Sequence, residues 1–228
     1  MRVNLPLLAA QITGMFLVFA AVLFTAAGTT AWPAGWAFLL LFFGFVVGLT
    51  VWLLRYNPSL LTERMTGIGK SDQKTWDKVF FVLLNVLFIT WLVVMPLDAV
   101  RFNWSNVPAA LQIVGALALV LSFYFFYRTF KENAYLSPAV RIQSDRGQHV
   151  VTTGPYHYVR HPMYAAATIF LVSTSLLLGS WLGVLAALAL ILAIAFRATR
   201  EEQTLSQELP GYADYMAQVR YRLVPHVW

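Results

Sequence analysis

Residues 163–197 read MYAAATIFLVSTSLLLGSWLGVLAALALILAIAFR, two apolar runs divided by Gly179 and Ser180. A helix needs about 20 apolar residues to cross a bilayer, and each run lies near the lower limit of that length. Glycine followed by serine is typical of a turn between periodic segments. The stretch therefore predicts a tight helical hairpin near the end of the chain.

The composition of the whole chain is that of an integral membrane protein. Of its 228 residues, 59% are hydrophobic and 11% are charged, whereas an ordinary soluble domain is about 45–50% apolar and about 25% charged. There is no cysteine, which excludes disulfides, thiolate metal sites and a cysteine nucleophile. The net charge of +6 is better explained by loops that touch anionic headgroups than by nucleic-acid binding.

Four further apolar runs precede the hairpin. Each is long enough to cross a bilayer, and they cover residues 5–27, 33–54, 79–97 and 108–130. With the hairpin, they predict an all-α, multi-pass transmembrane bundle of about six spans. The first run lacks a cleavage motif, so we expect a retained helix and not a signal peptide.

Polar segments divide the chain. We expect an N-terminal hairpin with its loop over residues 1–78 and a core over residues 79–228, because residues 55–78 are polar and Asn57-Pro58 is a helix breaker. Residues 131–162 form a long polar connection of the kind that is often functional. For the tail, residues 199–228, we expect a helix followed by a segment that lies on the bilayer.

The lysines and arginines predict the orientation. With six spans, every Lys and Arg except Arg101 falls on the side of the two termini. Cytoplasmic loops carry such an excess of cations, so we expect both termini, and any site beside them, to face the cytoplasm. The short loops favour a prokaryotic inner membrane.

Two polar motifs flank the hairpin: residues 154–164 read GPYHYVRHPMY, and residues 197–202 read RATREE. His161 and Tyr164 are three residues apart at the start of one helix, and Arg197 and Glu201 are four apart at the end of the other, so each pair shares a helix face. The hairpin would bring both faces together at the membrane surface. Polar groups are costly there, which favours a functional site.

Taken singly, these residues have simpler explanations. Interfacial Tyr and His are common membrane anchors, an arginine at a helix end often snorkels to the headgroups, and Glu201 and Glu202 suit a solvated helix. Only the whole set, at this spacing around one hairpin, indicates a site.

The combination G-P-Y, R-H-P-M-Y and E-E resembles the signature of integral-membrane methyltransferases. This family includes isoprenylcysteine carboxyl methyltransferase and the phospholipid methyltransferases, and the resemblance covers residues 110–225. Residues 209–215, LPGYADY, are similar to a further family stretch, F-G-x-x-Y-x-x-Y, but are one residue shorter, which leaves the register of the tail open.

The resemblance implies that the cofactor is S-adenosyl-L-methionine and that no metal is needed. The residues that would bind the cofactor are Gln148, His149, Val150, Val151, Tyr156, His161, Pro162, Met163, Tyr164 and Glu201. Arg197 matches the arginine that contacts the substrate in the family. Glu202 or His161 would assist catalysis if the acceptor had to lose a proton.

We expect a lipid or another hydrophobic small molecule as the acceptor, entering from the bilayer. A carboxylate is favoured because Arg197 offers a fork of donors, while an amine or a thiol and the oligomeric state stay open. Two rival functions are an NADPH-dependent reductase of the sterol-reductase type and a non-enzymatic membrane assembly factor. A transporter fits less well, because the expected spans hold few charges away from their ends.

Overall fold

The computed structural model describes residues 3–66 and 73–228, and in this part of the chain it contains helices and no strand. The main elements in chain order are α1 (Leu5–Ala27), α2 (Pro33–Tyr56), α3 (Pro58–Thr66), α4 (Thr75–Pro96), α5 (Ala109–Glu132), α6 (Pro162–Leu177), α7 (Trp181–Glu208) and α8 (Tyr212–Gln218). Shorter turns of helix are the π-helix η1 (Leu97–Arg101) and the 3-10 helices η2 (Ser144–Arg146) and η3 (Gly154–His157).

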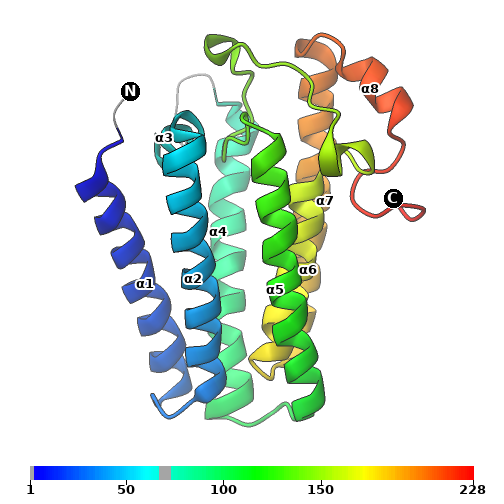
Figure 1. Ribbon diagram of the computed structural model, residues 1–228. Coiled ribbons are helices and arrows are strands. Elements are labelled where there is room, and N and C mark those ends of the chain that lie inside the picture. Colours follow the sequence, from blue (N-terminus) through cyan, green and yellow to red (C-terminus); the bar gives the residue numbers. More distant parts are fainter. Residues whose placement is uncertain (1–2, 67–72) are drawn as a thin grey trace.

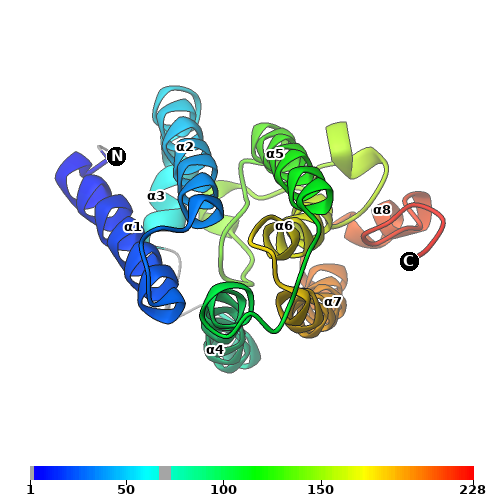
Figure 2. The same cartoon turned by 90° about the horizontal axis from the view of Figure 1, so that it is seen from below.

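The helices form the predicted multi-pass transmembrane bundle. Five of them (α1, α2, α4 continued by η1, α5 and α7) are long and apolar enough to cross a membrane, and α6 is a shorter apolar helix. They run up and down, and both termini and the long connection after α5 lie toward one end (Figure 1). Seen along the bundle, α6 lies between α5 and α7 (Figure 2).

The predicted hairpin is confirmed, with α6 and α7 joined by a tight turn at residues 178–180. Gly179 adopts a φ of +83°, a left-handed conformation that glycine takes without steric cost. The hydroxyl of Ser180 then caps α7 by accepting the backbone N–H of Gly183 at 2.7 Å.

One local expectation was wrong, and two segments can now be described more closely. α7 continues past the apolar run that ends at Arg197 and reaches Glu208, because its polar extension is rich in good helix formers. Asn57-Pro58 does not keep the loop irregular: proline suits the first turn of a helix, and the Asn57 side chain accepts the N–H of Leu60 at 3.2 Å, so α3 begins there. The tail is attached to the residues before α6, because the carbonyls of Tyr221 and Arg222 accept the backbone N–H groups of Arg160 and His161; its expected position on the bilayer stays a prediction.

Close packing between α5 and α6 fixes the hairpin in the bundle. A Cβ on Gly115 would lie 2.6 Å from the backbone nitrogen of Leu177, so only glycine lets these two helices approach so closely. Further along, the rings of Phe42, Phe123 and Phe170 from α2, α5 and α6 lie within 5.8–6.5 Å of one another. Such aromatic clusters add to the packing of the core.

A buried carboxylate holds the hairpin at the end of the bundle opposite the termini. Asp98 of η1 is fully buried, and its Oδ2 accepts the hydroxyls of Ser105 and Ser180, both at 2.6 Å, and the N–H of Leu182 at 3.1 Å. The charge also faces the positive N-terminal end of α7. Asp98 therefore ties the start of α7 to the end of α4.

Replacing this carboxylate should destabilise the bundle. Asp98→Ala removes the acceptor of one buried donor and two partly buried donors, and an unsatisfied buried donor costs about 1–3 kcal/mol. We expect the midpoint of thermal unfolding in detergent to fall by about 5 °C or more, measured by scanning fluorimetry. Asp214→Ala, at an exposed position of α8, is the control, and equal midpoints for the two variants would contradict this role.

Candidate functional site

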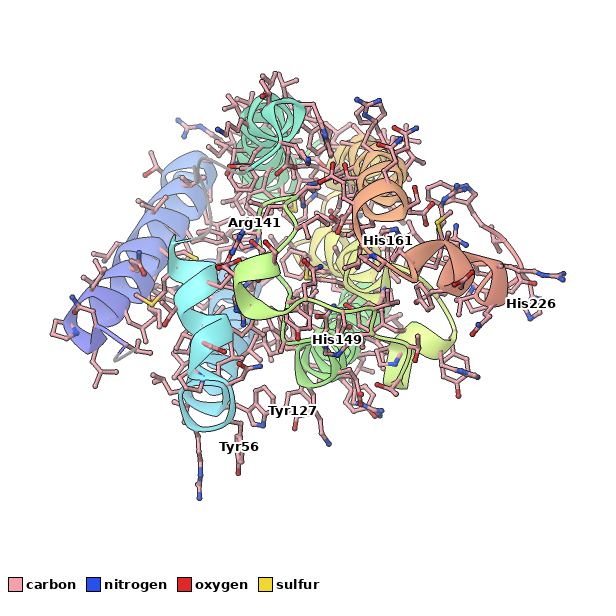
Figure 3. The ribbon with its side chains drawn as sticks, turned by 90° about the horizontal axis from the view of Figure 1, so that it is seen from above. Tyr56, Tyr127, Arg141, His149, His161 and His226 are labelled. Atoms are coloured by element: carbon pink, nitrogen blue, oxygen red, sulfur yellow. The ribbon has the colours of Figure 1, made fainter. Side chains whose placement is uncertain are left out.

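A pocket opens at the end of the bundle that carries the termini. Its walls come from the connection after α5, the start of α6, the end of α7 and α8, and the empty space in and in front of it, open solvent included, is about 850 Å³. Viewed onto this end, the labelled side chains of Arg141, His149 and His161 lie near the middle, whereas Tyr56 and His226 lie at the rim (Figure 3).

The structure brings the residues named from the sequence motifs together. All ten residues expected to bind a cofactor line the pocket, and Arg197 lines it too. Their roles toward a cofactor remain predictions. Glu202 is buried next to the pocket but is not one of the residues that line it.

Tyr164 joins the two ends of the hairpin. Its hydroxyl donates to Glu201 Oε2 at 2.5 Å and accepts from Arg197 Nη1 at 3.1 Å. Its ring stacks on the imidazole of His161, with centroids 5.3 Å apart and an interplanar angle of 12°. The start of α6 and the end of α7 therefore form one continuous polar surface in the pocket.

Arg197 is held by a carboxylate that the sequence analysis missed. Its Nε donates to Asp77 Oδ1 at 3.0 Å and its Nη2 to the carbonyl of Pro138 at 2.7 Å. Asp77 belongs to the first turn of α4 and is fully buried. In the sequence, the one signal for Asp77 is its position as an acid at the start of an apolar run. Neighbouring residues of both charges made that signal hard to recognise.

Glu202 accepts three charged or polar donors. Its Oε1 accepts from Arg160 Nε at 2.6 Å and from His161 Nε2 at 3.2 Å, and its Oε2 accepts from Arg222 Nε at 2.8 Å. Because both oxygens are occupied, these contacts favour an anchoring role for Glu202 over the proton transfer suggested from the sequence. The anchor fixes the imidazole of His161 and ties the tail to the start of α6.

A polar wall of the pocket is attached to α3. Arg141 forms a bidentate ion pair with Glu63, with both contacts at 3.1 Å and both side chains buried. Arg64 of α3 donates to the carbonyl of Leu136 at 3.1 Å. Burial, and secondarily the charge of Arg197, lowers the pKa of Arg64 to about 10, so Arg64 stays charged at neutral pH.

The segment that precedes η3 is ordered by side chains predicted to bind the cofactor. Gln148 Oε1 accepts the backbone N–H of Gln143 at 2.7 Å. His149 Nδ1 lies 3.0 Å from the hydroxyl of Tyr135. Residues 148–151 line the pocket and form no strand.

The remaining wall is aromatic. The phenol of Tyr156 accepts from Asn133 Nδ2 at 2.8 Å, and Tyr215 donates to the backbone carbonyl of Tyr156 at 2.7 Å. Burial raises the pKa of Tyr156, Tyr212 and Tyr215, so their rings are neutral at physiological pH. Tyr212 and Tyr215 were not named as site residues, although the Y-x-x-Y spacing of the tail pointed to them.

The fold and pocket define a class of protein: a multi-pass membrane protein whose terminal hairpin builds a polar and aromatic pocket at one end of the bundle. Residues 110–210 match the model of the phospholipid methyltransferase family. The match contains α6, α7 and most of the pocket walls. It confirms the resemblance given by the motifs.

This match points to an enzyme with methyltransferase activity on a lipid. No curated protein sequence matches the chain.

Removing the charge of Glu202 should loosen the anchor around His161. Glu202→Gln leaves Arg160 as a buried cation without its carboxylate, and breaking such a pair costs about 3–5 kcal/mol. We expect a clearly lower midpoint of thermal unfolding than for Glu208→Gln, a control on an exposed part of the same helix whose salt bridge to Lys74 is worth little. Equal midpoints would show that the buried pairs contribute nothing.

Proposed function

We propose that the protein transfers a methyl group from S-adenosyl-L-methionine to a lipophilic acceptor at the membrane surface. One observation carries the proposal: within the region that matches the family, the motif residues from both ends of the hairpin line a single pocket. Tyr164 connects them by hydrogen bonds to Glu201 and Arg197.

The chemistry of the pocket suits this cofactor. Glu201 offers a carboxylate to hydroxyl or ammonium donors, which form charge-assisted hydrogen bonds. Tyr156 and Tyr212 offer aromatic faces for stacking and for contact with a cation. The segment 148–151 adds backbone donors and acceptors. When bound, the cofactor supplies an activated methyl group, so the protein has mainly to align the acceptor and exclude water.

The arginines that line the pocket are each paired with a carboxylate. Arg141 pairs with Glu63, Arg160 with Glu202 and Arg197 with Asp77. In contrast, Glu201 accepts from a neutral group: within residues 3–66 and 73–228, its hydrogen-bond donor is the phenol of Tyr164.

The expected preference for a carboxylate acceptor relied on a free Arg197, and the pair with Asp77 removes that argument. The carboxylate of Glu201, which lines the pocket and accepts from a neutral phenol, favours an amine or another cationic acceptor. An amine must lose a proton to react, and Glu201 Oε1 and the imidazole of His161 are the pocket groups that we propose to accept it.

We further propose that the pocket faces the cytoplasm. The long loops that carry most of the lysines and arginines lie at the pocket end of the bundle (Figure 1), and such loops are retained on the cytoplasmic side. The cofactor would then enter from the cytosol and the acceptor from the bilayer.

Binding of the cofactor is the direct test. We expect micromolar affinity for S-adenosyl-L-methionine by isothermal titration of the detergent-solubilised protein. Glu201→Ala and Tyr164→Ala should each weaken it by about tenfold or more, because hydrogen bonds to charged groups contribute about 1.5–3 kcal/mol. Glu208→Gln, on the exposed continuation of α7, should leave the affinity unchanged.

Two results would overturn this assignment. Affinity that is the same in both pocket variants and in the wild type would remove the proposed site. Binding of NADPH in place of S-adenosyl-L-methionine would favour the reductase alternative.

The acceptor can be found in membrane lipid extracts. Expression of the wild type with isotope-labelled methyl donor should produce a lipid with one added labelled methyl group, detected by mass spectrometry, and fragmentation should place the label on a nitrogen. Glu201→Ala, expressed to the same level, is the control. A label on a carboxylate oxygen would restore the preference first expected from the sequence.

A further inference from the structure

Asp77 lies outside the region that matches the family and outside every motif of the hairpin. It belongs to the first turn of α4, its side chain is completely buried, and it contacts a residue that lines the pocket. A buried charge is costly unless it is paired, so its partners indicate what it does.

The carboxylate joins three elements. Its Oδ1 accepts from Arg197 Nε of α7 at 3.0 Å, and its Oδ2 accepts from the backbone N–H of Val140 at 2.8 Å and from Gln73 Nε2 at 2.9 Å. The backbone N–H of Lys74 donates in turn to the carbonyl of Val140. Asp77 therefore holds both the guanidinium of Arg197 and the segment of the connection that forms the adjacent wall.

The same contacts determine the charge that the pocket presents. Arg197 is 7% exposed, and in such a partly desolvated site a charge acts over longer distances than in water. The carboxylate of Asp77 balances the positive charge of Arg197, so that the carboxylate of Glu201 determines the net charge that the pocket presents to a ligand. Without the charge of Asp77, the pocket becomes more positive by one unit.

We infer that Asp77 is a specificity-determining positioning residue: it neutralises Arg197 so that the pocket favours cationic ligands, namely a sulfonium donor and an amine acceptor, over neutral or anionic ones. The inference rests on the proposed function, because it names ligands of the same pocket. It adds a residue from α4 to a pocket whose lining comes from the hairpin, α8 and the connection after α5.

The test compares two ligands that differ in the charge on sulfur. S-adenosyl-L-methionine is a sulfonium, whereas S-adenosyl-L-homocysteine has a neutral thioether and an otherwise similar shape. We take the ratio of their dissociation constants, sulfonium over thioether, measured by isothermal titration of the full chain in detergent. Asp77→Asn keeps the size of the side chain and removes its charge, so the ratio should rise by about threefold or more.

Further variants separate charge from structure. Arg197→Gln leaves Asp77 as an uncompensated anion, so the ratio should fall below that of the wild type. The double variant, Asp77→Asn with Arg197→Gln, restores neutrality and should return the ratio toward the wild-type value. Asp214→Asn, an exposed acid of α8, should leave the ratio unchanged.

The outcomes divide cleanly. If Asp77→Asn weakens both ligands equally and keeps the ratio, Asp77 only holds the structure and the inference is wrong. If Asp77→Asn does not fold, the ratio in Arg197→Gln decides: a fall supports the inference and an unchanged ratio overturns it. If the wild type binds neither ligand, the proposed function itself fails and the inference fails with it.

Discussion

Charged side chains at the edge of a hydrocarbon layer require opposite charges close by, and this constraint organises the whole site. The arginines that line the pocket receive carboxylates from three different helices: Glu63 of α3 for Arg141, Asp77 of α4 for Arg197, and Glu202 of α7 for Arg160. Removing one partner of a buried ion pair costs much more free energy than formation of the pair contributes to stability. The ion pairs therefore hold separate structural elements in place around one pocket.

Local patterns were sufficient to predict the hairpin and the residues that it presents. The glycine between two apolar runs determines the turn, and spacings of three and four residues place His161 beside Tyr164 and Arg197 beside Glu201. Once the turn brings the helix ends together, Tyr164 meets both Arg197 and Glu201 without any further element. These interactions depend on short-range geometry, which a sequence carries directly.

Interactions between distant segments were not predictable in the same way. Asp77 and Arg197 are 120 residues apart, and Glu63 and Arg141 are 78 apart. An acid at the start of an apolar run, the one signal for Asp77, does not identify the partner of that acid. The partner of Arg197 could not be foreseen for this reason, since an arginine without a known partner is easily interpreted as a residue that binds an anionic substrate. The helix α3 was missed because Asn57-Pro58 suits a helix start as well as it suits a break.

Ion pairs of the pocket cross the expected boundary at residue 78. Glu63 and Asp77 both precede it, yet they anchor Arg141 and Arg197 of the pocket in the core that follows. The family match begins later still, at residue 110, so it contains most of the lining and only one of the three carboxylates that balance the arginines. One segment gives this pocket its shape, and another segment supplies its charge balance. The ligand preference of such a pocket can change through the second segment alone. We therefore expect proteins that share this hairpin to differ in the acceptor that they bind. The difference should follow the acidic residues that the helices equivalent to α3 and α4 supply.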